Sequence, residues 1–307
     1  MKRLPMLMIG GVCLLAAGCG APSSGALGPA PTATAQTPSP AVSPGTGTAS
    51  AAPSPSGQPP TATATPAQGP AREIGLQAWF SRNGKLFVTK RTVPATTGIG
   101  QAALDRMLTG PSAAEYAAGL RSRIPAGTTV RGVRISAGIA TVDLSSSFES
   151  AASPSAMPLR IAQVVYTLTQ FPTVTGVRFA INGQGVTAVG GVPVQSPQTR
   201  AMYRGYLPAI TVRSPVIGAP VTSPVTVSGT ADVFEATVSV RILDSAGHEI
   251  ARTFTTASCG TGCRGDYSVT VSYSVPRTQP GTIEVFESSA KDGQPVNVQL
   301  IPVTLAP

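Results

Sequence analysis

The sequence lacks most of the residues from which enzymes and metalloproteins build their sites. Its 307 residues include one histidine and four cysteines. It contains no glycine-rich phosphate loop, no His-Glu zinc pair and no Gly-x-Ser-x-Gly nucleophile motif. His248 stands alone, so a histidine-based metal site and a Cys-His thiol hydrolase both lack a partner residue. We therefore predict no catalytic residue, no metal ion and no cofactor.

Charged residues are also scarce, at 11% of the chain, and none lies between Gly20 and Ala71. Proline, alanine, serine, threonine and glycine dominate this stretch. Such a composition cannot bury an apolar core. We therefore expect residues 19–71 to form a disordered, partly polyproline-like stalk.

The N-terminus has the layout of a bacterial export signal. The basic residues Lys2 and Arg3 precede an apolar run, Leu4–Leu15, and a few small residues lead to Cys19. The run is shorter than the about 20 residues that a membrane-spanning helix needs, so residues 1–18 are predicted to be a signal peptide. Residues 15–19 read Leu-Ala-Ala-Gly-Cys and resemble a lipobox, which implies cleavage before Cys19 and attachment of acyl chains such as palmitate. This resemblance predicts an extracytoplasmic protein anchored to the bacterial cell membrane, the alternative being a plain secretory signal with an incidental cysteine.

Two cysteines remain for the folded part, because Cys13 falls in the predicted signal peptide. Cys259 and Cys263 enclose only Gly-Thr-Gly. Outside the cytoplasm we expect this pair to form a disulfide that closes a tight loop. A redox-active pair is the alternative.

Positive charge is concentrated in the first half of the folded region. Residues 72–192 contain twelve Lys and Arg against five Asp and Glu, whereas residues 193–307 contain eight of each. A basic domain beside a membrane is suited to anionic lipid headgroups or wall polymers. Arg131, Arg134 and Arg178 are predicted to share one face of a sheet and to form the binding surface, the alternative being scattered solvated arginines. Nucleic acid is not expected as a partner of an exported protein whose only tryptophan is Trp79.

Residues 72–192 change between the strand period of two and the helix period of 3.6. Asn83-Gly84 is a strong hairpin signal, and Ala137-Gly138 separates a second pair of strands. The predicted strands are 76–80, 85–88, 131–135, 139–144 and 177–181, and the predicted helices cover 104–108, 112–120 and 159–170. This order predicts an α+β domain in which helices cover one face of a sheet.

Four sequence segments in this domain resemble the GerMN (sporulation and spore germination) family. They are residues 108–111 (Leu-Thr-Gly-Pro), 124–128 (Ile-Pro-Ala-Gly-Thr), 140–148 (ATVDLSSSF) and 163–174 (QVVYTLTQFPTV). The resemblance covers most of the domain. It implies a non-catalytic module, similar to ring-building domains of bacterial envelope machines. Because the family also occurs in bacteria that do not sporulate, the resemblance does not establish a spore role.

After a predicted linker, 193–206, residues 207–307 contain short alternating runs separated by proline and glycine. Such spacing predicts an all-β sandwich. Residues 223–225, 228–236 and 286–293 resemble the immunoglobulin-like domain of bacterial spore germination proteins. That resemblance implies an adhesion or docking module without known chemistry.

Three functions remain open at this stage. The first is a non-enzymatic envelope lipoprotein that binds protein partners or wall polymer as a scaffold. This function includes a role in sporulation or germination. The second is a sensor or ligand-binding lipoprotein that regulates a membrane partner. The third is a peptidoglycan-active enzyme that uses Asp143 and Glu149, although an aspartate at a strand end more often serves as a turn or helix cap.

Overall fold

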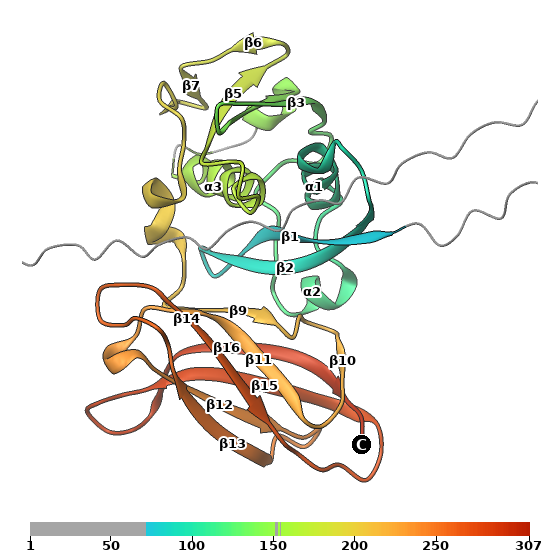
Figure 1. Cartoon of the computed structure of the whole chain (residues 1–307), viewed down its shortest axis with the longest axis vertical. Helices are drawn as coiled ribbons and strands as arrows, with labels where there is room; N and C mark the ends of the chain where they lie inside the picture. Colours follow the sequence, from blue (N-terminus) through green and yellow to red (C-terminus); the bar gives the residue numbers. More distant parts are fainter. Residues whose placement is uncertain (1–71, 151–152, 154) are drawn as a thin grey trace, which may run out of the picture. The chain divides into compact units, whose positions relative to one another are not determined.

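The computed structural model describes residues 72–150, 153 and 155–307 (Figure 1). The predicted signal peptide, the predicted stalk and Cys19 lie outside the described residues. Within those residues, no helix is long and apolar enough to cross a membrane.

The first domain opens with an antiparallel hairpin of β1 (Glu73–Arg82) and β2 (Lys85–Pro94). Asn83 and Gly84 form its turn with φ angles of 52° and 73°, which suit an Asn-Gly loop of two residues. Residues 78–81 are all buried, although alternate residues of a strand point to opposite faces. Both faces of the hairpin are therefore covered, one of them by helices.

Two helices follow, α1 (Ile99–Leu108) and α2 (Ala113–Ala117). Helix α1 ends just before Gly110, whose φ of 82° lies in the left-handed region that stops a helix. Helix α2 begins with a capping box, in which the Ser112 hydroxyl and the Glu115 carboxylate each accept the other residue's backbone N–H.

The main sheet of the first domain has the strand order β3-β4-β5-β6. Its strands are β3 (Val130–Ser136), β4 (Ile139–Leu144), β5 (Gly176–Ile181) and β6 (Gln184–Gly185). The short 3-10 helix η1 (Ser146–Glu149) and helix α3 (Met157–Leu168) connect β4 to β5, which pair in parallel.

Helix α3 lies between this sheet and the hairpin (Figure 1). Every residue of α3 except Pro158 is buried. The sequence predicted helices on one face of a single sheet, whereas the structure adds β1 and β2 as a further layer beyond α1 and α3. The difference arises because β1 and β2 form a two-stranded sheet of their own among the described residues. The alternation of apolar residues predicts a strand but does not show which sheet that strand joins.

The segment between the domains is packed against the first domain. After the small ladder of β7 (Ala188–Val189) and β8 (Val192–Pro193), Gln198 forms a β-bridge with Val177. The 3-10 helix η2 (Arg200–Tyr206) follows. Its Tyr203 hydroxyl donates to the Gln198 side chain at 2.6 Å, so the residues predicted to be a linker have specific side-chain contacts.

The second domain is a sandwich of two sheets, with strand orders β10-β16-β15-β12-β13 and β14-β11-β9. The strands are β9 (Ile210–Ser214), β10 (Pro220–Val221), β11 (Val225–Ala231), β12 (Thr237–Leu243), β13 (Glu249–Thr256), β14 (Gly265–Val271), β15 (Gln279–Ser288) and β16 (Pro295–Leu305). A short 3-10 helix, η3 (Phe234–Ala236), precedes β12. The predicted fold class, an α+β domain followed by an immunoglobulin-like sandwich, is confirmed.

The two domains belong to one compact unit. Buried apolar side chains of both contribute to one continuous core cluster. Strand β2 of the first domain contacts β9 of the second, so the hairpin is covered on the side away from the helices.

Candidate functional site

The sheet of the first domain carries a row of exposed arginines on its open face. Ala140, Val142 and Leu144 of β4 are buried, so Thr141 between them faces outward. Across the sheet, Thr141 pairs with Arg134 of β3 on one side and with Arg178 of β5 on the other. The sequence prediction placed these two arginines on one face, and the structure brings both guanidinium-bearing side chains to it.

Arg131 joins this face through an irregularity of β3. The register shifts between Val130 and Gly132, and the Arg131 side chain reaches Asp143 of β4 at 3.5 Å. Within the described residues, Arg134 and Arg178 take part in no ion pair. We call Arg131, Arg134 and Arg178 the arginine strip, in which one positive charge of three is neutralised.

The two acids considered for catalysis have structural contacts instead of facing each other across a cleft. Asp143 accepts the backbone N–H of Gly183 at 2.9 Å, besides its ion pair with Arg131. Glu149 accepts the backbone N–H of Gly190 at 3.0 Å. Each carboxylate therefore holds a different loop, and the geometry offers no paired acid and base.

A third acid, Glu115, is buried and was not singled out from the sequence. It forms a salt bridge of 2.6 Å with Arg91 and accepts hydrogen bonds from the Thr89 hydroxyl and the Ser112 N–H. Burial by itself would raise its pKa, but the hydrogen bonds from Arg91, Thr89 and Ser112 outweigh burial and lower the pKa of Glu115. A carboxylate that is ionised and fully paired in this way holds structure and does not transfer protons.

Cys259 and Cys263 are joined in a disulfide, with their Cα atoms 5.7 Å apart. The loop between them is fixed to the segment before η3, because Gly262 N–H donates to Asp232 at 2.9 Å and Thr261 N–H donates to the Val233 carbonyl at 2.9 Å. The disulfide therefore positions a loop at one end of the sandwich. Among the described residues, no group of three or more His, Cys, Asp or Glu side chains is placed to hold a metal ion.

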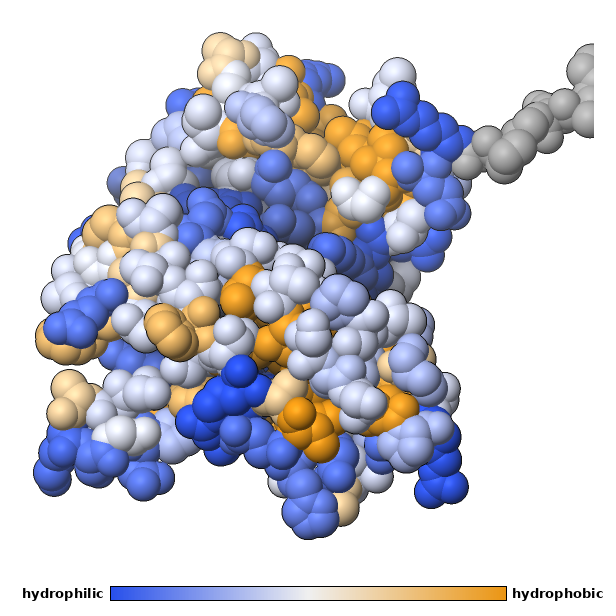
Figure 2. Space-filling view, turned by 60° about the horizontal axis from the view of Figure 1, so that its bottom comes forward, coloured by the Kyte–Doolittle hydropathy of each residue, from blue (hydrophilic) through white to orange (hydrophobic). Residues whose placement is uncertain are grey.

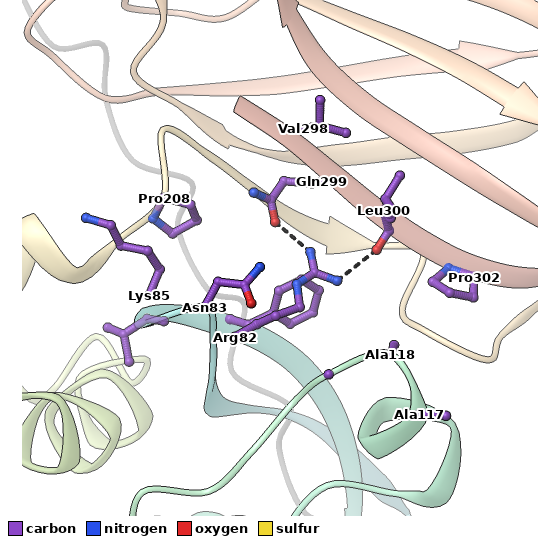
Figure 3. A pocket seen from close by; sticks show the side chains of 13 residues that line it. Arg82, Asn83, Lys85, Ala117, Ala118, Pro208, Val298, Gln299, Leu300 and Pro302 are labelled. Carbon is purple, nitrogen blue, oxygen red and sulfur yellow. Dashed lines mark hydrogen bonds between the residues drawn. The ribbon is translucent and has the colours of Figure 1, made fainter. Parts of the chain in front are cut away.

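Arg82 of the first domain forms hydrogen bonds with the second domain (Figure 3). Its guanidinium donates to the Leu300 carbonyl at 2.9 Å and to the Gln299 side chain at 2.8 Å, and it lies 4.2 Å above the Phe87 ring. Burial lowers the pKa of Arg82 to about 10, so it stays charged at neutral pH. A cavity of about 360 Å³ lies beside it, lined by residues of both domains that include Lys85 and Pro302 (Figure 3).

In the sequence, Arg82 lies between the first two predicted strands, directly before the Asn83-Gly84 turn. Its partners lie more than two hundred residues later in the chain, at separations of 217 and 218 residues. No local signal in the sequence distinguishes such an anchor from a solvated turn arginine.

Comparison with known proteins identifies both domains. Residues 79–187 match a family model described as sporulation and spore germination, and residues 209–294 match one described as an immunoglobulin-like domain of bacterial spore germination. Neither description names an enzyme. No curated protein matches the sequence significantly.

Two solved structures illustrate the similarity. The first GerMN domain of the sporulation protein GerM from Bacillus subtilis is 27% identical, with a TM-score of 0.37, over 42% of this chain and 98% of that chain. The tandem GerMN domains of the same protein are 17% identical, with a TM-score of 0.37, over 76% of this chain and 61% of that chain. The two family matches alone show that the chain carries a sporulation and spore germination domain at residues 79–187, followed by an immunoglobulin-like domain of bacterial spore germination at residues 209–294.

Proposed function

We propose that this chain is a non-enzymatic lipoprotein of the bacterial cell envelope that binds an anionic cell wall polymer through the arginine strip. The observation that carries the proposal is the row of Arg134, Thr141 and Arg178. Two exposed guanidinium groups flank a small side chain there, and within the described residues neither has a carboxylate partner. Guanidinium groups match the phosphate and carboxylate groups of such polymers.

The surface chemistry supports binding through polar groups. The face drawn in Figure 2 is mainly hydrophilic, and its hydrophobic residues gather in several separate groups. Large continuous apolar patches are the usual mark of tight protein interfaces. Exposed guanidinium groups such as those of Arg134 and Arg178 are better suited to an anionic polymer, to which they would bind with strong dependence on salt.

The envelope location rests on the export signal and on Cys19, both read from the sequence. A lipid on Cys19 would hold the folded unit to the membrane, and the charge-free segment before Arg72 would act as a spacer to the wall. A role in sporulation or germination is supported only by the descriptions of the two matching families.

The test replaces the two unpaired arginines of the strip. The Arg134→Gln/Arg178→Gln variant is compared with Arg106→Gln/Arg277→Gln, whose arginines are exposed and form no side-chain hydrogen bond or ion pair within the described residues. Both variants lose the same charge. Exposed contacts of about 0.5–1 kcal/mol each predict a roughly five- to thirtyfold loss of binding for the strip variant only.

Binding is measured by co-sedimentation with purified cell wall at low and at physiological salt. Equal retention of the two variants at low salt would show that the strip has no special part in binding. Anionic vesicles are the second target, and binding to vesicles without binding to wall would overturn the assignment to a wall polymer.

A second function, ligand binding, is favoured by a specific observation. A larger cavity lies elsewhere in the same compact unit, and several arginines line it.

A further inference from the structure

A cavity of about 710 Å³ opens where both domains and η2 come together. Four arginines line it, and two of them, Arg200 and Arg204, come from η2. Arg213 comes from β9, and Arg264 directly follows the disulfide loop. Binding sites for small molecules usually measure about 300–1,000 Å³, so the cavity has the size of such a site. We call it the arginine pocket.

Local hydrogen bonds hold two of these arginines in place. Arg200 donates to the Thr169 hydroxyl at 2.8 Å and to the Tyr166 carbonyl at 3.0 Å. Arg264 donates to the Pro208 carbonyl at 2.6 Å and to the Thr230 carbonyl at 3.3 Å. These acceptors are neutral, so they orient the two guanidinium groups without neutralising them.

The other two arginines differ in their surroundings. Arg213 forms an ion pair with Asp266 and donates to the Gly229 carbonyl at 3.1 Å. Arg204 is exposed and makes no side-chain hydrogen bond or ion pair within the described residues. Of the four cations, only Arg213 therefore has a carboxylate of the described residues in direct contact.

The positive charge of the pocket lining exceeds the negative charge of its one acidic residue, Asp232. Four arginines against Asp232 give the lining a formal charge of +3, or +2 once Asp266 is counted with Arg213. Burial lowers the pKa of Arg200, and the positive charge of Arg213 lowers it further. Burial likewise lowers the pKa of Arg264. Gathering half-buried like charges is unfavourable unless an anion compensates them.

Trp79 forms part of the wall of the pocket. Its ring packs against Tyr166 at 4.8 Å between centroids, and the guanidinium of Arg200 lies 5.7 Å from the Trp79 ring and 4.8 Å from the Tyr166 ring. Trp79 is 4% exposed, and its indole N–H has no hydrogen-bond partner among the described residues. Buried indole N–H groups usually find an acceptor.

We propose that the arginine pocket binds a small organic polyanion, with two or more phosphate or carboxylate groups, distinct from the surface polymer assigned to the arginine strip. A dianion or trianion matches the uncompensated charge, and oriented guanidinium groups bind both kinds of anionic group through paired N–H donors. A concave site of this volume encloses a discrete ligand and not a membrane surface. The proposal is independent of the arginine strip, because no strip residue lines the pocket.

The disulfide has a part in this site. Cys263 and Gly262 line the pocket, and Gly262 N–H holds Asp232, the acidic lining residue, at 2.9 Å. The closed loop therefore fixes both Asp232 and the start of the segment that carries Arg264. This arrangement gives the Cys259–Cys263 pair a role at the pocket.

The test uses the purified full-length protein and isothermal titration calorimetry. Fructose 1,6-bisphosphate and citrate are the phosphate and carboxylate probes, and inorganic phosphate is the single-anion comparison. Trp79 is the only tryptophan of the chain, so its fluorescence reports whether a bound probe lies at the pocket. We expect saturable binding of one or both polyanions, with a change in Trp79 emission, and at least tenfold weaker binding of inorganic phosphate.

Arg204→Gln is the primary variant because nothing in the described fold depends on its side chain. We expect about tenfold weaker polyanion binding in this variant, equivalent to about 1.4 kcal/mol. The matched control, Arg277→Gln, removes the same charge from the surface and should bind like the unaltered protein. Arg264→Gln provides a second variant, with thermal unfolding to check that it folds.

Three outcomes would overturn the proposal. They are no saturable heat with either polyanion, equal affinity for inorganic phosphate and the polyanions, and unchanged binding in both Arg204→Gln and Arg264→Gln. Failure here leaves the arginine strip untouched, because Arg134→Gln/Arg178→Gln is scored on cell wall and not on soluble probes.

Discussion

Glu115 shows how one buried carboxylate can hold several segments of a small domain together. Its partners come from β2 (Thr89 and Arg91) and from the residue that caps α2 (Ser112). Arg91 also donates to the Gly110 carbonyl at 3.3 Å, which links the end of α1 to the same cluster. Removing one member of such a buried, hydrogen-bonded ion pair leaves the other charge uncompensated, which destabilises a fold.

We expect Glu115→Gln to lower the free energy of unfolding by about 2 kcal/mol at neutral pH, since it removes hydrogen bonds to a charged group. The folded-state pKa of Glu115 lies below its ordinary value of 4.5. Its contribution is therefore present above about pH 4.5 and is lost as the pH falls through the folded-state pKa. Urea unfolding at several pH values should show the difference between the variant and the unaltered protein shrinking in acid.

The matched control for this prediction is Glu73→Gln. Glu73 is exposed and its side chain forms no hydrogen bond or ion pair within the described residues. It should change the stability little at any pH. A difference between Glu115→Gln and the unaltered protein that does not depend on pH would contradict the role given to the ionised carboxylate.

At the scale of single elements, Gly229 determines how β11 fits between its neighbours. The register of β11 against β9 shifts between Ser228 and Gly229, so the strand is irregular there. A methyl group at position 229 would overlap the Thr211 carbonyl, and it would meet the Tyr267 hydroxyl at 2.7 Å. Both obstacles belong to strands that pair with β11, so neither can move without disturbing the sheet.

We expect Gly229→Ala to destabilise the protein by about 2–3 kcal/mol, because a methyl group is forced into backbone that cannot yield. Gly185→Ala in β6 is the control, since a methyl group there meets nothing within 4 Å. Thermal or urea unfolding of both variants measures the difference. Similar stabilities would mean that the β9–β11 irregularity can relax.

Local signals in the sequence were sufficient for most of the elements. Asn83-Gly84 predicts the first hairpin because it adopts the left-handed turn conformation readily, and the apolar stripe of 159–170 predicts α3. Strand β13 (Glu249–Thr256) is hard to predict from the sequence because it has no buried apolar face. Its Phe254 is 70% exposed, and at the edge of its sheet β13 buries none of its side chains fully.

The sites were predictable only where neighbouring strands make them. Alternation along β3 and β5 predicts that Arg134 and Arg178 lie on one face, and the strand register agrees, while their role in binding stays a prediction. The arginine pocket was not, since residues 193–307 carry equal numbers of positive and negative side chains. Four of the eight positive ones converge on the pocket, and only tertiary structure reveals that clustering.

At the scale of the whole molecule, the two domains act as one unit because polar anchors supplement their shared core. Arg82 binds Leu300 and Gln299 of β16, and Lys85 donates to the Gly205 carbonyl of η2 at 2.8 Å. The arginine pocket depends on this junction, because its lining comes from both domains. A family match to either domain alone could not have indicated the pocket.

The proposed attachment of this unit to a membrane depends on one residue outside the described part of the chain. We expect Cys19→Ala to move the protein from the membrane fraction to the soluble fraction, or to leave a precursor that retains residues 1–18. The reason is that each buried CH₂ of an acyl chain contributes about 0.8 kcal/mol to membrane binding, and the variant cannot carry the chains.

Cys13→Ala is the matched control, because Cys13 lies within the predicted signal peptide and should be removed with it. Fractionation and intact mass distinguish the cases. Unchanged membrane association and unchanged mass in Cys19→Ala would rule out the lipid anchor. If Cys13→Ala also lost membrane association and the mass of the processed, lipidated protein, the cause would be failed export and not a missing lipid.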